Sequence, residues 1–253
     1  MKLVVANWKM EPQTLLEARK LARVTAKKAR TLQNVRTVIC PPFVFLQGFK
    51  KITDNAWCSL GAQDVFWEER GSHTGEVSAF MLEDAKVKYV LAGHSERRAL
   101  GETDEMVNKK IRTALAHNMT AVICVGERVR DEDGAYLSFV ENELRQAFVK
   151  VPKDALSHVV IAYEPVWAVG HKALRADTPE ELFPMVIFIR KIVSKLFGAD
   201  AAHKIQVLYG GSVDEKNAEG FLAKGNVDGL LVGRASLDAK KFSAILEVAE
   251  KYC

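Results

Sequence analysis

The sequence predicts an α/β fold, a single-domain (β/α)8 barrel with parallel strands that spans residues 1–253. Three observations lead to this prediction. Short, continuously apolar runs rich in β-branched residues recur eight times, helical patterns separate them, and no Pro/Gly/Ser-rich linker divides the chain. Continuous hydrophobicity indicates strands that are buried on both faces, as in a parallel sheet covered by helices. Barrels of this kind reach about 250 residues as single domains.

The eight candidate strands lie at residues 3–6, 38–40, 58–62, 89–92, 121–125, 159–163, 205–208 and 229–232. Two of the intervening helices are predicted from apolar residues that share one helical face, namely Val107, Ile111, Ala114 and Leu115 in one, and Phe242, Ile245, Leu246 and Ala249 in the other. Alternating strands and helices imply right-handed crossovers, which close most economically into a barrel. An open, doubly wound sheet is the alternative fold.

Composition narrows the function classes. The net charge is +4, and the basic residues are interspersed with acidic ones, which argues against a nucleic-acid partner. The N-terminal apolar run is too short for a signal peptide, and no stretch approaches the roughly 18 apolar residues of a membrane span, so we expect a cytoplasmic protein without a membrane partner. Cys40, Cys58, Cys124 and Cys253 form no CxxC pair. We therefore expect reduced thiols, with neither a disulfide framework nor a metal site.

The ends of the candidate strands carry the residues of interest, because catalytic groups of barrels gather where strands end. Lys9, His94 and Glu164 follow the first, fourth and sixth candidate strands and should converge on one mouth of the barrel. Together they form a set of groups suited to proton transfer.

Glu164 is the candidate general base. The neighbouring Tyr163, Val166 and Trp167 are expected to desolvate its carboxylate partly and raise its basicity. A structural carboxylate paired with a lysine or arginine is an equally open alternative.

His94 and Lys9 are the candidate electrostatic groups. His94 opens a segment that resembles a helix N-terminus, where the helix dipole favours a neutral ring able to donate a hydrogen bond to a substrate oxygen. Lys9 offers a positive charge to a phosphorylated substrate or an enediolate, and Asn7 points to the same side of the strand. The alternatives are a structural histidine and, for the lysine, a solvated or Schiff-base role.

Two glycine-bearing turns suggest a phosphate site. Gly210, Gly211 and Ser212 follow the seventh candidate strand, and Gly233 and Arg234 follow the eighth. Barrels frequently bind phosphate at these two positions through backbone N–H groups and a helix N-terminus. The ligand is therefore predicted to be a phosphate ester.

Four segments together resemble the signatures of the triosephosphate isomerase family: NWKM at 7–10, GHSERR at 93–98, YEPVWA at 163–168 and YGGS at 209–212. They occur in order at successive strand ends, and the resemblance runs from Lys2 to the C-terminal helix. It implies an isomerase that interconverts dihydroxyacetone phosphate and D-glyceraldehyde 3-phosphate, a step of glycolysis and gluconeogenesis, without a cofactor.

The resemblance also implies roles for individual residues. Glu164 would move a proton between C1 and C2, and a neutral His94 would polarise the carbonyl, which is the known arrangement of this family. Lys9 and Asn7 would hold the substrate. Glu96 would be a buried carboxylate partner of the lysine, and Ser95 would support the residues that touch the substrate.

Phosphate binding and assembly follow from the same resemblance. Backbone N–H groups of Gly170, Ser212, Gly233 and Arg234 would bind the phosphate, and the segment after Pro165 would be a lid that excludes water. The long third loop, with Gln63, Thr74, Gly75 and Glu76, would insert into a partner subunit, so a homodimer is expected.

The sequence departs from the family pattern at two places. The lid at 168–178 is longer than usual and lacks a second glycine, and Arg234 replaces the usual second glycine after the eighth strand. Arg234 can offer its N–H only if its φ angle is not positive, and its side chain would either add a charge near the phosphate or point to solvent. Two other functions stay open: a different phosphate-binding barrel enzyme, such as an aldolase or epimerase with a covalent lysine adduct, and a barrel without catalytic activity.

Overall fold

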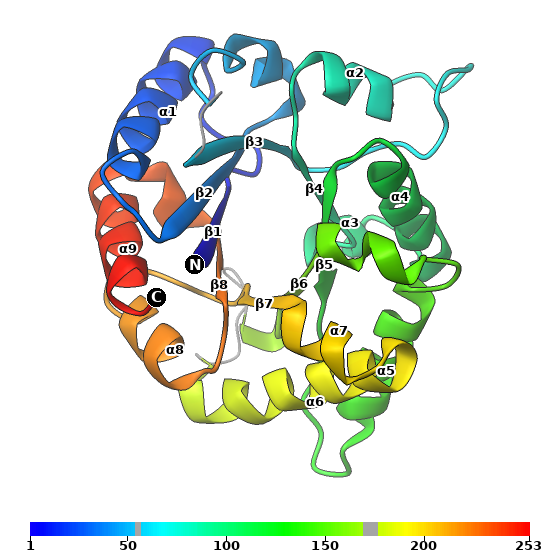
Figure 1. The fold of residues 1–253 in the computed structure, drawn as a ribbon. Coiled ribbons are helices and arrows are strands. Elements are labelled where there is room, and N and C mark those ends of the chain that lie inside the picture. Colours follow the sequence, from blue (N-terminus) through cyan, green and yellow to red (C-terminus); the bar gives the residue numbers. More distant parts are fainter. Residues whose placement is uncertain (54–56, 169–176) are drawn as a thin grey trace.

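The computed structural model describes residues 1–53, 57–168 and 177–253, and within them eight parallel strands pair in chain order into a closed barrel (Figure 1). The last strand returns to the first, with Ala6 opposite Val232. The predicted fold class is therefore confirmed, and the open sheet is excluded. The strands are β1 (Lys2–Asn7), β2 (Val35–Cys40), β3 (Cys58–Ala62), β4 (Tyr89–Ala92), β5 (Thr120–Val125), β6 (Val159–Tyr163), β7 (Gln206–Tyr209) and β8 (Gly229–Val232).

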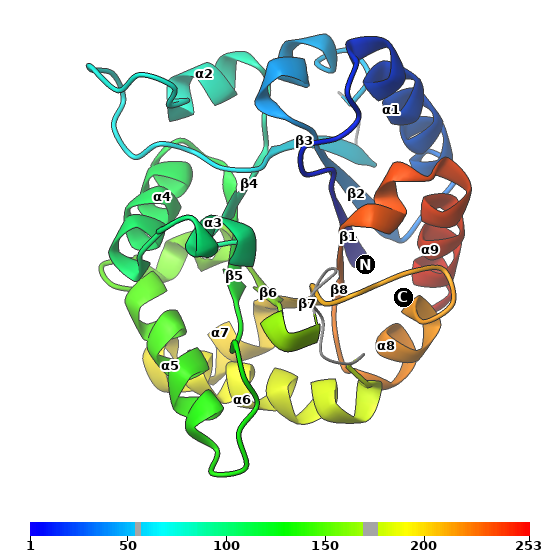
Figure 2. The same ribbon diagram turned by 180° about the vertical axis from the view of Figure 1, so that it is seen from behind.

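Helices form a ring around the barrel, as Figure 2 shows from the opposite end. The predicted apolar faces of α4 and α9 are confirmed, because Val107, Ile111 and Phe242 are fully buried or nearly so. Among the described residues, no helix is long and apolar enough to cross a membrane. The helices are α1 (Leu15–Ala29), α2 (Ala79–Asp84), α3 (Ser95–Ala99), α4 (Asp104–Ala116), α5 (Ala135–Ala147), α6 (Pro179–Phe197), α7 (Ala199–Lys204), α8 (Ala218–Lys224) and α9 (Ala239–Lys251), with 3-10 turns η1 (Phe43–Gly48), η2 (Lys153–His158), η3 (Val166–Ala168) and η5 (Arg234–Leu237).

Polar side chains define where several helices begin. Thr14, Thr103 and Thr178 precede α1, α4 and α6, and each hydroxyl accepts a hydrogen bond from a backbone N–H in the first helical turn. Caps of this kind stabilise a helix by about 1 kcal/mol each.

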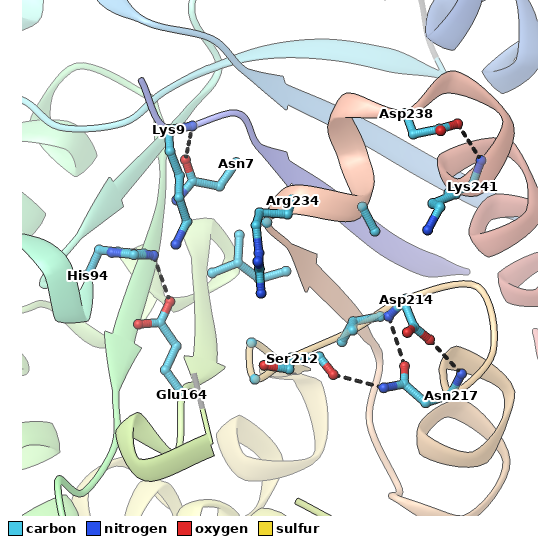
Figure 3. A pocket seen from close by; sticks show the side chains of 16 residues that line it. Asn7, Lys9, His94, Glu164, Ser212, Asp214, Asn217, Arg234, Asp238 and Lys241 are labelled. Atoms are coloured by element: carbon cyan, nitrogen blue, oxygen red, sulfur yellow. Dashed lines mark hydrogen bonds and ion pairs between the residues drawn. The ribbon is translucent and has the colours of Figure 1, made fainter. Parts of the chain in front are cut away.

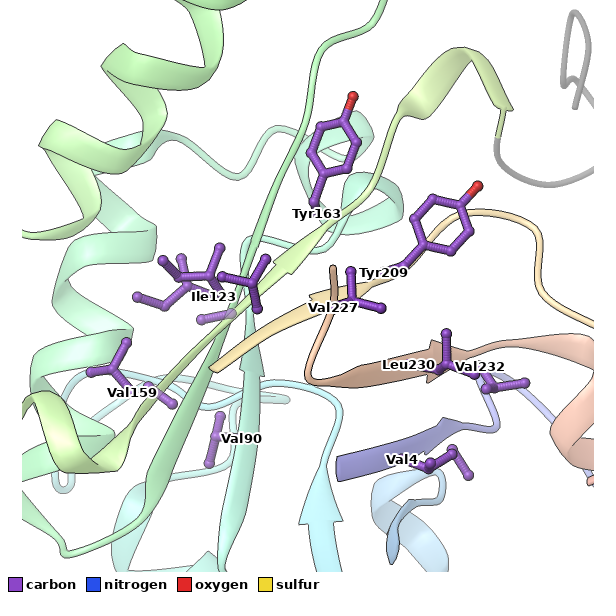
Figure 4. Packing of buried hydrophobic residues seen from close by; sticks show 14 of the residues in the cluster. Val4, Val90, Ile123, Val159, Tyr163, Tyr209, Val227, Leu230 and Val232 are labelled. Carbon is purple, nitrogen blue, oxygen red and sulfur yellow. The ribbon is translucent and has the colours of Figure 1, made fainter. Parts of the chain in front are cut away.

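The core has two layers, which explains the continuous hydrophobicity of the strands. Along β1, Leu3 and Val5 belong to the cluster inside the barrel, whereas Val4 and Ala6 belong to the layer between barrel and helices. Figure 4 shows part of this outer layer. Burial of one valine or leucine side chain stabilises the folded state by about 1.5–3 kcal/mol. Both faces of every strand therefore contribute to stability.

The same alternation aims side chains into the mouth of the barrel. Successive residues of a strand point to opposite faces. Asn7 follows the inward-facing Leu3 and Val5 at two-residue intervals, and Glu164 follows the inward-facing Ala162. Both polar side chains therefore extend the interior rows of their strands at the end where β1 and β6 terminate.

The cysteines are all free thiols, as predicted. Cys40, Cys58 and Cys124 are buried in the barrel wall, and Cys253 is exposed at the C-terminus. Burial raises the pKa of each buried thiol well above its ordinary value, so these groups are held in the protonated form.

Candidate active site

A cavity of about 630 Å³ opens at the mouth of the barrel where the strands end (Figure 3). The structure brings nearly all of the predicted catalytic and substrate-binding residues to it. Gly170 lies outside the described residues. The predicted residues that line the cavity are Asn7, Lys9, His94, Glu164, Ser212, Gly233 and Arg234.

Glu164 is buried, with 2% of its surface exposed, and its carboxylate is fixed by groups from the neighbouring loop. The Ser95 N–H donates to Oε2 at 3.1 Å, and His94 Nε2 lies 3.5 Å from Oε1. Over residues 1–53, 57–168 and 177–253, Oε1 has no hydrogen-bond partner and neither lysine nor arginine pairs with this carboxylate. The geometry thus favours a base over a structural ion pair, because a carboxylate oxygen remains available to accept a proton.

The side chains expected to surround Glu164 lie elsewhere. Tyr163 donates to Glu127 Oε1 at 2.8 Å, and Trp167 Nε1 donates to the same oxygen at 2.8 Å. Because β6 alternates, Tyr163 faces the outer layer when Glu164 faces the cavity. The expectation that Tyr163 and Trp167 desolvate the base is corrected: they bury Glu127 instead.

Close backbone packing buries Glu164 in their place. A Cβ atom on Gly126 would fall 1.9 Å from the carbonyl oxygen of Glu164, and one on Gly210 would fall 2.8 Å from its Cγ. The Cys124 thiol is also adjacent, since burial and then the Glu164 carboxylate raise the pKa of that thiol. Two glycines therefore let the neighbouring strands approach the base on both sides.

His94 is the N-cap of α3, as its sequence position suggested. Its Nδ1 accepts a hydrogen bond from the Glu96 N–H at 3.2 Å. A ring nitrogen that accepts a hydrogen bond carries no proton, so a neutral ring has its proton on Nε2. This nitrogen faces Glu164 and the cavity (Figure 3), where it can donate to a substrate oxygen.

Lys9 adopts a backbone conformation that is uncommon for residues other than glycine, with a φ of 56°. Two hydrogen bonds stabilise it: the Lys9 N–H donates to Asn7 Oδ1 at 3.0 Å, and Gln63 Nε2 donates to the Lys9 carbonyl at 2.7 Å. Strained residues persist only where the surrounding structure over-determines them. The two bonds place the side chain at the cavity.

Glu96 forms the expected ion pair with the lysine but is not buried. Its Oε1 lies 2.5 Å from Lys9 Nζ, while 57% of its side chain is exposed. The prediction of a buried partner is wrong for the single chain, because Glu96 lies in the first turn of the short helix α3, where its side chain stays exposed. Such an exposed pair contributes little to stability, although it does orient the ammonium group.

The turns after β7 and β8 form the other side of the cavity. The Ser212 hydroxyl donates to the Ala168 carbonyl at 2.8 Å. Gly233 is the N-cap of η5, and the φ angle of Arg234 is not positive. The backbone N–H of Arg234 can therefore be offered to a ligand, as the sequence analysis required. The first N–H groups of a helix lack partners within the helix, which suits this end to an anion.

Several residues of the cavity were not predicted from the sequence. Asn217 Nδ2 donates to the Ser212 carbonyl at 2.9 Å and supports that turn. The sequence does hold a signal for Asp238, because an aspartate directly before an amphipathic helix is a typical N-cap. Leu231 is one of several apolar residues of β8, and nothing in the sequence marks it as a cavity residue. The unpredicted polar and apolar residues that line the cavity are Val213, Asp214, Asn217, Leu231, Ala235, Asp238 and Lys241.

The predicted interface residues lie outside the cavity. Gln63 contacts the Lys9 and Cys40 carbonyls. Thr74, Gly75 and Glu76 are exposed on the segment between β3 and α2, which projects from the barrel in both views (Figures 1 and 2).

Comparison with known proteins agrees with this geometry. A sequence model of the triosephosphate isomerase family matches residues 2–249. The chain is 40% identical over 246 residues to triosephosphate isomerase of Thermoanaerobacter pseudethanolicus, covering 96% of this chain and 98% of the relative. It is 42% identical over 252 residues to the enzyme of the same name from Natranaerobius thermophilus, covering 99% and 96%. The chain therefore belongs to the triosephosphate isomerase family and is an isomerase.

Proposed function

We propose that the protein interconverts dihydroxyacetone phosphate and D-glyceraldehyde 3-phosphate by proton transfer through an enediol(ate), a step of glycolysis and gluconeogenesis. One observation carries the proposal: the buried Glu164 carboxylate faces the cavity with an oxygen that has no hydrogen-bond partner among the described residues, next to His94. This arrangement suits abstraction of a proton α to a carbonyl.

Each residue has a distinct part in the proposed reaction. Glu164 removes a proton from one substrate carbon and returns it to the next. His94 donates a hydrogen bond from Nε2 to the oxygen that gains negative charge, and the Lys9 ammonium stabilises the same charge. Asn7 holds Lys9 by accepting its N–H. The N–H groups of Ser212, Gly233 and Arg234 bind the phosphate, together with Gly170, which lies outside the described residues.

We further propose that the single domain assembles as a homodimer. The projecting segment with Thr74, Gly75 and Glu76 would insert into the partner subunit, and Met10, which is 83% exposed beside Lys9, would be covered there. The Gln63 hydrogen bond to the Lys9 carbonyl links this loop to the active site. Assembly would therefore support catalysis. A cytoplasmic location, without a membrane or nucleic-acid partner, fits a soluble sugar-phosphate substrate.

A coupled assay in both directions on the purified protein tests the activity. Isomerisation of dihydroxyacetone phosphate without added cofactor or metal supports the proposal. Borohydride treatment with the same substrate separates it from aldolase chemistry, since a Schiff base at Lys9 would be reduced to a stable adduct. Trapped adduct without isomerisation would overturn the proposed function.

A further inference from the structure

Arg234 contributes a long cationic side chain to the lining of the cavity. It is the first residue of η5 and directly follows Gly233, the N-cap. Its side chain extends into the cavity between Lys9 and the Ser212 turn (Figure 3). Of the two alternatives that the sequence left open for this side chain, the structure therefore favours a charge near the expected phosphate site over a side chain that points to solvent.

A second cation, Lys9, lies next to the turn that carries Arg234. A Cβ atom on Gly233 would lie 3.4 Å from Lys9 Cε and 3.9 Å from its Nζ, so the lysine packs against the residue that precedes Arg234. The Lys9 ammonium forms its ion pair with Glu96, and the Arg234 side chain is a second cation that lines the same cavity. A phosphate that enters the cavity gains favourable Coulomb energy from a cation at short range.

The nearby carboxylates are directed toward their own loops. Asp214 Oδ1 accepts hydrogen bonds from the N–H groups of Lys216 and Asn217 at 2.9 and 3.0 Å. Asp238 Oδ1 accepts from two N–H groups of α9, at 2.8 and 3.1 Å. The Asp238 carboxylate is occupied in this way as the cap of a helix, and that of Asp214 as part of a turn.

We propose that the Arg234 guanidinium binds the phosphate of the triose phosphate directly, in addition to the backbone N–H groups of the site. Guanidinium groups bind phosphate with two parallel N–H donors, and such charge-assisted hydrogen bonds are stronger than neutral ones. The phosphate is remote from the reacting carbons and unchanged in the reaction, so this contact stabilises substrate and transition state alike. It lowers KM and leaves kcat unchanged.

The inference rests on the proposed function and is tested with R234Q and R234G. The first variant removes the charge but keeps a long side chain, and the second also removes the side chain but keeps the N–H. We expect KM for dihydroxyacetone phosphate and the inhibition constant of inorganic phosphate to rise together by about ten- to hundredfold in both variants. We expect kcat to stay within about threefold, a difference smaller than 1 kcal/mol in barrier.

Two controls separate this role from others. D-glyceraldehyde lacks the phosphate, so its kcat/KM should be unchanged in R234Q, whereas a merely structural arginine would lower it. K240Q removes the same charge from an exposed residue of α9 that does not line the cavity. It should leave KM and phosphate inhibition unchanged at moderate salt.

Equal effects of R234Q and K240Q, or an unchanged phosphate inhibition constant in R234Q, would overturn the role of Arg234 while leaving the proposed function intact. An inactive wild-type protein would instead refute the proposed function itself.

Discussion

Gly210→Ala should reduce catalysis by displacing the base, Glu164, without removing any polar group from the active site. The added Cβ would lie 2.8 Å from Glu164 Cγ and 3.4 Å from the Tyr163 carbonyl oxygen. Carbon atoms pack best at about 3.5–4.0 Å. The distance to the carbonyl oxygen is an ordinary van der Waals contact, whereas the distance to Cγ is too short, so the side chain of Glu164 must move by about 1 Å.

The structure sets the size of this effect. A displacement of about 1 Å in an active site costs on the order of a hundredfold in rate, or about 2.7 kcal/mol. We expect kcat to fall by this factor in the coupled assay, with KM nearly unchanged. Gly220→Ala is the matched control, since its Cβ meets only Pro179 Cγ, at 3.3 Å, and α8 tolerates alanine. If Gly210→Ala folds normally and keeps more than about a third of the wild-type kcat, the position of Glu164 does not govern catalysis.

Three further predictions concern charge, pH and assembly. Lys9→Ala should lower kcat/KM by about a hundredfold or more, as for loss of a transition-state donor; retention of a tenth of the activity would contradict the role of Lys9. Burial raises the pKa of Glu143 to about 7, against the opposing effect of Arg98. The folded state therefore keeps a proton that the unfolded state has lost between about pH 4.5 and 7, so the free energy of unfolding should fall as pH rises through this window. Glu143→Gln should flatten that dependence in urea titrations, and an unchanged slope would show that another group causes it. Arginine at both Thr74 and Glu76 should give monomers of low activity, and an active dimer in sedimentation would refute the proposed interface.

The fold was predictable because one physical signal repeats. All eight strands were located to within a few residues, since a strand buried on both faces must be continuously apolar, as in Val159–Tyr163. The strand near Ile205 begins one residue later in the structure, at Gln206. Lys204 ends α7 and Ile205 is its C-cap, a boundary that hydrophobicity alone does not fix.

The sequence predicted which residues line the cavity better than it predicted the contacts and burial of their side chains. The ends of parallel strands meet at one mouth of the barrel, which places Lys9, His94 and Glu164 together. The exposure of Glu96 and the pairing of Trp167 with Glu127 depend on which way each side chain turns after its strand has ended. Such contacts join residues far apart in the chain, and local sequence carries no signal for them.

The most direct test of the proposed mechanism follows the proton. Dihydroxyacetone phosphate is turned over in D₂O by the wild-type protein and by Glu164→Gln, and deuterium at C2 of the product is measured by NMR. A carboxylate base exchanges its captured proton with water, so the wild-type product should carry deuterium. The variant should neither exchange nor isomerise, yet should still bind inorganic phosphate. Product formed at the wild-type rate without deuterium, together with an active Glu164→Gln variant, would contradict proton transfer by Glu164.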